Sequence, residues 1–261
     1  CEFPEDTLIV GTSGRYEFKN KGINVFLEAL NRLNRDKNLK KKVLAFVNVP
    51  SWVGDPREDL LERLNSKEIF TTPLTCPLIT HWLHNMTHDQ VLDMLKYLGM
   101  GNNPDDKVKV IFVPCYLDGF DGIVNKHYYD VMLCEDLTVY PSYYEPWGYT
   151  PLESVAFKVP TITTDLAGFG LWANTLKGGK YSEIEDGVKV IHRSDYNYSE
   201  VADVIRDTIV SFSAKSDTEV KKIRKNAASV AEKALWKHFI KYYYEAYDIA
   251  LCNAQKRNAN A

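Results

Sequence analysis

Short runs of apolar and β-branched residues alternate along the chain with longer stretches of helical periodicity. After Gly22, for example, Ile23, Phe26 and Leu30 recur three or four positions apart, a spacing that puts them on one face of a helix. A run such as KVLAFVNV is instead typical of a buried strand. The pattern predicts strands at residues 7–13, 42–49, 107–113, 137–142, 159–165 and 187–193.

Capping signals mark the starts of several helical stretches. N-caps are predicted at Asp55, Thr87 and Thr150, each followed three positions later by a Glu or Gln that completes a capping box. Pro56 and Pro151 directly follow two of these caps, at the first helical position, which suits proline. The predicted helices cover residues 22–35, 55–64, 87–99, 150–157, 199–212, 217–235 and 236–251.

This regular alternation of strands and helices predicts an α/β fold with a doubly wound parallel sheet, Rossmann-like, and helices on both faces. No internal repeat, low-complexity tract or proline-rich linker divides the sequence, so residues 1–261 are expected to form one domain. Ligands in such folds bind beyond the carboxyl ends of the strands. The loops of interest are therefore residues 12–22, 115–125, 142–150 and 164–170.

Composition narrows the possible partners. The chain is 45% hydrophobic and 26% charged, as in an ordinary soluble globular protein. Its net charge of -3 and pI near 6.1 lack the basic excess that binding to a phosphate backbone requires, so no nucleic-acid partner is expected. The sequence contains no apolar run of about 18 residues, so no membrane-spanning helix is expected.

The cysteines and the N-terminus point to a cytoplasmic protein. No CxxC pair or framework spacing occurs, which favours reduced thiols over disulfides or a zinc site. The opening CEFPEDTLIV has too little apolar character for a signal peptide and lacks an initiator Met, so a processed chain or an excised piece is expected. The cysteines are Cys1, Cys76, Cys115, Cys134 and Cys252.

The loop SGRYEFKNKG carries two cations, Arg15 and Lys21, between the first predicted strand and the first predicted helix. Free backbone amides and the helix dipole attract anions at such a place, and two cations can hold a diphosphate. A solvated loop with ordinary surface charges would have the same sequence. No Walker lysine or GxGxxG accompanies it, so neither a P-loop nor a dinucleotide fingerprint applies.

The stretch YPSYYEPWGYTPLE has the same strand, loop and helix order. Gly148 would let the backbone approach a ligand, and the amides of Tyr149 and Thr150 would point at an anion beyond the helix start. Glu145 precedes the turn, has no capping role and is expected to face the ligand. Glu153 has two candidate roles, completing the capping box or accepting hydrogen bonds from ligand hydroxyls, and its position favours the cap.

Two further groups of residues have alternative interpretations. His81, His84 and His88 have a spacing that could bind a metal, but no acid or cysteine completes the set, so no metal is expected. The aromatic stripe of the last helix could bind sugar rings, although its helical spacing favours packing. No Ser-His-Asp or Cys-His arrangement and no GxSxG motif is evident. The stripe consists of Phe239, Tyr242, Tyr243 and Tyr247.

Together these motifs resemble the glycogen synthase family of the animal and fungal type. Besides the two loops, the resemblance covers HNMTHD, KVKVIFVPCYL and VPTITTDLAGFG, from about residue 7 to residue 170. The EPWGYTPLE stretch is its most specific part because it contains both glutamates of the family motif. The resemblance implies a retaining glycosyltransferase of the GT-B type, built from two Rossmann-like domains, of which this chain would be the C-terminal, donor-binding half.

The resemblance also implies roles for single residues. Arg15 and Lys21 would hold the donor diphosphate, and Glu145 would lie beside the transferred glucose. Glu153 would bind the ribose hydroxyls, and Tyr128 would lie against the base, although Tyr129 is adjacent and the alignment is loose there. Backbone amides from residues 148, 149 and 150 would meet the phosphates.

Glucose would thus pass from UDP-glucose, or from ADP-glucose, to the non-reducing end of an α-1,4-glucan, with no cofactor or metal. An N-terminal acceptor domain is expected as a partner, with the last helix, about residues 236–252, docked on it, so this piece alone should bind donor but hardly catalyse. A homo-oligomer is possible. The sparse basic residues in KKIRKNAASVAEK predict weak or no activation by glucose 6-phosphate. Another retaining nucleotide-sugar transferase and a non-catalytic nucleotide- or glucan-binding module remain alternatives.

Overall fold

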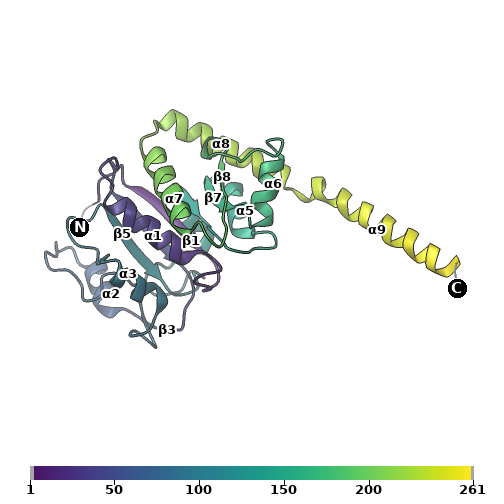
Figure 1. The fold of residues 1–261 in the computed structure, drawn as a ribbon. Coiled ribbons are helices and arrows are strands. Elements are labelled where there is room, and N and C mark those ends of the chain that lie inside the picture. Colours follow the sequence, from purple (N-terminus) through teal and green to yellow (C-terminus); the bar gives the residue numbers. More distant parts are fainter. Residues whose placement is uncertain (1–2, 260–261) are drawn as a thin grey trace.

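A six-stranded parallel sheet forms the centre of the computed structural model, which describes residues 3–259 (Figure 1). The strand order is β5-β2-β1-β6-β7-β8, and every neighbouring pair runs parallel. All six strands coincide with strands predicted from the sequence, so the predicted doubly wound sheet is confirmed. The strands are β1 (Leu8–Ser13), β2 (Val43–Asn48), β5 (Val108–Val113), β6 (Leu137–Val139), β7 (Thr161–Thr164) and β8 (Val188–Ile191).

Helices cover both faces of this sheet. In β8, Ile191 belongs to the core that contains α1 and α7, whereas Val188 and Val190 belong to a second core with α5, α6 and α8. Alternate residues of one strand point to opposite faces, so the two cores lie on opposite sides of the sheet. The helices are α1 (Ile23–Asn34), α2 (Glu58–Asn65), α3 (Gln90–Tyr97), α4 (Tyr128–Leu133), α5 (Tyr149–Ala156), α6 (Gly168–Thr175), α7 (Tyr198–Ser213), α8 (Asp217–Lys233) and α9 (Trp236–Ala259), with a 3-10 turn at Ile184–Asp186.

The predicted helix at residues 55–64 starts later than its capping signal. Asp55 and Pro56 belong to strand β3 (Val53–Pro56), which pairs antiparallel with β4 (His81–Leu83). Helix α2 therefore begins at Glu58. The predicted N-cap is wrong because pairing with β4, a strand that the sequence pattern did not reveal, keeps Asp55 and Pro56 extended.

The predicted caps at Thr87 and Thr150 are also wrong. Helix α3 is capped by Asp89, whose carboxylate accepts hydrogen bonds from the amides of Val91 and Leu92 at 3.0 Å. Helix α5 follows Gly148, and no side chain caps it. In both places a residue near the predicted Thr precedes the helix instead, namely Asp89 before α3 and Gly148 before α5.

Helix α9 extends away from the rest of the chain (Figure 1, yellow), and none of its described residues is buried. Among the described residues, its aromatic contacts with the rest of the chain come from its start, where the Phe239 ring lies 5.5 Å from the rings of Trp147 and Trp172. The predicted packing of the aromatic stripe is therefore confirmed for Phe239, whereas Tyr242, Tyr243 and Tyr247 are about half exposed. Docking of α9 on another domain stays a prediction.

Four of the five cysteines lie within the described residues. Cys76, Cys115, Cys134 and Cys252 are free thiols, and Cys1 lies outside the described residues. Within residues 3–259, no helix has both the length and the apolar character needed to cross a bilayer.

Candidate functional site

The candidate site lies where the winding of the sheet reverses. From β1 the chain proceeds outward to β2 and β5, then returns to β6 on the other side of β1 and continues to β7 and β8. Such a switch point opens a crevice beyond the carboxyl ends of the two central strands, here β1 and β6. The predicted Arg15 and Lys21 loop follows β1, and the predicted EPWGYTPLE loop follows β6, so the fold brings the two loops to one place.

Gly22 allows these two loops to pack closely. It precedes α1 with φ 69°, and a Cβ atom there would lie 2.0 Å from the carbonyl oxygen of Pro141 in the loop after β6. The amide of Tyr143 donates to the carbonyl of Asn20 at 2.6 Å. The N-terminus of α1 is thus held directly against the second loop.

Lys21 and Glu145 form an ion pair across this junction. The two residues are 124 positions apart in the sequence, and their side chains are only 15% and 20% exposed. Backbone hydrogen bonds fix Glu145 further, because its amide donates to Leu166 O at 3.2 Å and its carbonyl accepts from Gly168 N at 3.1 Å. A cation and an acid predicted separately therefore meet at one rigid position.

The start of α5 presents free backbone amides. Gly148 has φ 107°, a conformation that favours glycine, and no side chain bonds to the amides that follow it. The amides of Tyr149 and Thr150 belong to this uncapped first turn. The Tyr149 side chain is 72% exposed.

Glu153 takes no part in capping α5, so that predicted role is wrong. Its carboxylate Oε1 instead accepts a hydrogen bond from the Tyr129 hydroxyl at 3.1 Å. Glu153 and Thr150 lie three positions apart on α5, which puts them on the same side of the helix. The carboxylate is thus available beside the helix start.

A pocket of about 500 Å³ occupies the crevice on the β1, β2 and β5 side. Three predicted residues line it, namely Arg15, Tyr128 and Thr150. The Tyr128 hydroxyl lies 2.6 Å from Ser13 Oγ, and burial raises the pKa of Tyr128 to about 12, so the phenol stays protonated. Lys21, Glu145, Gly148, Tyr149 and Glu153 do not line this pocket and lie in the adjoining loop and helix start.

Arg15 is the most exposed of the predicted cations. Its guanidinium is 77% exposed and lies 3.0 Å from the carboxylate of Glu17 in the same loop. This surface pair is weak and readily exchanged for a ligand contact. Arg15 is therefore free to turn toward the pocket that its own loop borders.

Sequence reasoning missed several polar residues of the pocket. Ser13 and Asn48 end two central strands, and both line the pocket. A search for polar residues at strand ends would have found them. Tyr129 could not be found in this way, because its contacts are with Glu153 of α5 and with Phe157, which directly follows α5.

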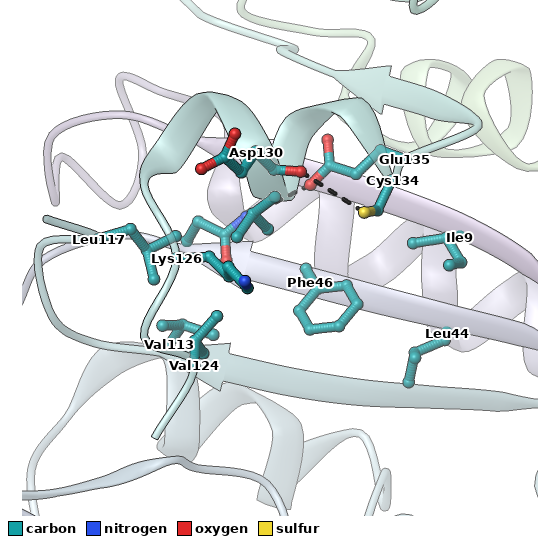
Figure 2. Close-up of a pocket in the computed structure, with 12 residues that line it drawn as sticks. Ile9, Leu44, Phe46, Val113, Leu117, Val124, Lys126, Asp130, Cys134 and Glu135 are labelled. Carbon is teal, nitrogen blue, oxygen red and sulfur yellow. Dashed lines mark hydrogen bonds between the residues drawn. The ribbon is translucent and has the colours of Figure 1, made fainter. Parts of the chain in front are cut away.

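A second pocket, of about 560 Å³, lies between α4 and the strands β1 and β2 (Figure 2). It shares Asn48 and Leu117 with the first pocket, and Ile9, Leu44 and Phe46 give it an apolar floor. Its charged lining residues are Lys126, Asp130 and Glu135 (Figure 2). None of the residues predicted from the sequence lines this pocket.

Glu135 is an unusually buried acid. Burial raises its pKa to about 8, and its one hydrogen bond among the described residues comes from Asn48 Nδ2 at 3.3 Å. Gly11 makes room for it, because a Cβ there would lie 2.0 Å from Glu135 Oε1. The carboxyl group is therefore protonated for the most part at neutral pH.

The three histidines considered as metal ligands do not form a group within the described residues. His81 lies near Cys115 and Asp121 instead, with one potential ligand atom of each within 4.8 Å. Both His81 nitrogens already have partners, Thr80 Oγ1 at 2.9 Å and the main-chain oxygen of Asp121 at 2.7 Å. The Asp121 carboxylate accepts from three amides of its own loop. These contacts indicate that His81 and Asp121 hold the loop after β5 in place.

The structure thus defines a Rossmann-like α/β domain with two loops, two cations and two acids gathered at its switch point. The sequence model of the family described as "Glycogen synthase" matches residues 2–71 and 58–259. The chain therefore belongs to the glycogen synthase family.

Individual relatives support this assignment. The glycogen [starch] synthase of Neurospora crassa is 27% identical over 313 aligned positions, which cover 98% of this chain and 44% of that protein. The human liver glycogen [starch] synthase is 25% identical over 96% of this chain and 42% of its own length. The chain thus spans less than half the length of these relatives.

Solved structures are similar in fold. The N-terminal domain of trehalose-6-phosphate phosphatase from Candida albicans superposes with a TM-score of 0.53 at 12% sequence identity, over 92% of this chain and 41% of that structure. At this identity the likeness concerns the fold alone.

Proposed function

We propose that this chain is the donor-binding half of a glycogen synthase that transfers glucose from a nucleotide sugar to the non-reducing end of an α-1,4-glucan, with retention of configuration. The observation that carries the proposal is the meeting of Lys21 and Glu145 at the switch point, beside a pocket lined by Arg15, Tyr128 and Thr150. Membership of the glycogen synthase family supports it.

The proposed chemistry follows from charge. In the transfer the bond between the glucose C1 and the donor phosphate oxygen breaks, and a bond forms between C1 and a hydroxyl oxygen of the glucan on the same face of the sugar. The leaving phosphate would accept the hydroxyl proton, and negative charge develops on the nucleoside diphosphate that leaves. Arg15, Lys21 and the free amides of α5 would stabilise that charge without any metal or cofactor; Lys21 and the amides are preorganised donors, and Arg15 would turn toward the ligand. The Lys21 ammonium would then lie between the diphosphate and Glu145, which would face the glucose.

The remaining parts of the proposal concern partners. UDP-glucose is the proposed donor, with ADP-glucose as the alternative. An acceptor domain outside this chain would supply the glucan site, and α9 would dock on it, since three of the four residues of its aromatic stripe are about half exposed. A cytoplasmic location is proposed from the free thiols and from the family.

Calorimetric titration of the chain with UDP and with ADP tests the proposal. UDP is expected to bind, and Arg15→Ala should weaken it by about 1.5 to 3 kcal/mol, the usual value of a charge-assisted hydrogen bond. Arg257→Ala, an exposed arginine of α9, is the matched control and should leave the affinity unchanged. Tighter binding of ADP than of UDP would reassign the donor, and binding of neither would contradict the proposal.

A further inference from the structure

Tyr129 connects helix α4 with helix α5. Its ring is stacked on Phe157 with 5.0 Å between centroids and 23° between planes, and Phe157 directly follows α5. The ring of Tyr128 lies 5.2 Å away, at 51° to the Tyr129 ring. The two aromatic neighbours restrict the ring of a tyrosine that is still 43% exposed.

The hydroxyl of this restricted ring donates to Glu153 Oε1 at 3.1 Å. The negative charge of Glu153 raises the pKa of the Tyr129 phenol, so the hydroxyl keeps its proton and remains a donor. Among the described residues, no second group donates to this carboxylate. The other oxygen, Oε2, is thus left without a donor among residues 3–259.

We propose that Tyr129 is a positioning residue for ribose recognition, which holds Glu153 so that its free oxygen accepts hydrogen bonds from the ribose hydroxyls of the bound nucleotide. The inference rests on the proposed function, because it assumes that a nucleotide occupies the pocket. Tyr128 lines that pocket and Tyr129 holds Glu153, so adjacent residues in the first turn of α4 serve the base and the ribose.

The physical reason is preorganisation. A glutamate at a helix surface loses rotamer freedom when it binds a ligand, and this loss weakens binding. A hydrogen bond from a ring that is already fixed by stacking restricts the carboxylate before the ligand arrives. The alternative is that Tyr129 only ties α4 to α5, and in that case the stacking alone matters.

Tyr129→Phe separates these possibilities because it keeps the ring and removes the hydroxyl. The affinities of the wild type and the variant are measured by calorimetry for UDP and for 2′,3′-dideoxyuridine 5′-diphosphate, which lacks both ribose hydroxyls. We expect the variant to bind UDP about fivefold more weakly, the size of one hydrogen bond, and to bind the dideoxy compound as the wild type does. The preference for UDP over the dideoxy compound should therefore shrink in the variant.

Two further variants complete the test. Tyr181→Phe removes a similarly exposed hydroxyl that donates to Asp165 at 2.8 Å, and it should change neither affinity. Glu153→Gln should remove most of the ribose preference and make Tyr129→Phe silent in the double variant, because the two residues act through one contact.

The possible results separate the inference from the proposed function. An unchanged ratio of the two affinities in Tyr129→Phe, or an equal loss for both compounds, overturns the positioning role while the nucleotide site stands. Failure of the wild type to bind either UDP or ADP overturns the proposed function and the inference with it.

Discussion

At the scale of single residues, the ion pair of Lys21 and Glu145 joins the loop after β1 to the loop after β6. Both side chains are mostly buried, so each charge depends on the other while the donor is absent. Removing one partner would leave the other charge poorly solvated, which costs more than loss of a surface pair. The pairing holds the Lys21 ammonium and the Glu145 carboxylate against each other, at the place where the proposed diphosphate and glucose would lie.

Glu135 provides a residue-scale prediction about stability. Its pKa is about 8 in the folded chain, against an ordinary value of 4.5, so the folded state retains a proton that the unfolded state releases. The free energy of unfolding should therefore fall as pH rises from about 4.5 to about 8, by about 3 kcal/mol between pH 4.5 and pH 7. Glu135→Gln should lack this fall and be more stable than the wild type at pH 7.

Urea unfolding of both proteins between pH 5 and pH 8 measures this effect, since other titrating groups cancel in the difference. Glu245→Gln, at an exposed position of α9, is the control and should follow the wild type. Parallel curves for the wild type and Glu135→Gln across this range would show that the acid is ionised in the folded chain.

At the scale of elements, contacts between loops decide where helices begin. Helix α1 starts where Gly22 meets the loop after β6, and α5 starts where Gly148 permits a left-handed turn. Neither helix has a side-chain cap. In α1 the Asn24 amide donates to the Phe18 carbonyl at 3.3 Å, whereas among the described residues the amides of Tyr149 and Thr150 in α5 have no partner. A ligand anion can satisfy these amides in place of a cap.

Gly22→Ala tests this junction. The new Cβ would collide with the carbonyl oxygen of Pro141 and would also have to adopt φ 69°, so we expect a loss of at least about 2 kcal/mol in unfolding free energy. Gly99→Ala is a matched control, because Gly99 has φ 70° and no atom within 4 Å of its would-be Cβ. That control should lose only about 1 kcal/mol, from the backbone conformation alone. Equal losses in the two variants would mean that the loops can move apart.

At the scale of the whole molecule, α9 contributes little to the stability of the described chain. None of its residues is buried, and its aromatic contacts with the body come from Phe239. Truncation after residue 240 keeps Phe239 and should change the thermal unfolding midpoint by no more than about 2 °C, because the removed segment buries almost no apolar area.

Differential scanning calorimetry of the chain with and without residues 241–261 checks this prediction. A truncation that ends after Leu235 is the comparison, and it should unfold at a lower temperature because the rings of Trp147 and Trp172 lose their contact with Phe239. A large destabilisation by the truncation after residue 240 would show that α9 packs on the domain in solution.

Periodicity in the sequence was enough to find the six strands of the main sheet and most of the helices, because alternation and helical spacing are local properties. It missed β3 and β4, which are short, and α4 and α6, which have six and eight residues. The three N-caps were predicted within three positions of the observed ones but on the wrong residues. Pairing of β3 displaced the cap predicted at Asp55, and Asp89 and Gly148 precede the helices in place of Thr87 and Thr150.

The sequence by itself determined the class of the fold and the two loops that form the site, since both follow from residue types at short spacing. Only the tertiary structure decided that Lys21 pairs with Glu145 and that Tyr129 holds Glu153. Glu153, predicted as a cap from its position in the sequence, instead accepts a hydrogen bond from Tyr129 of another helix. Such contacts join residues 24 to 124 positions apart, and they form only when the parallel strands bring their carboxyl ends to one edge of the sheet.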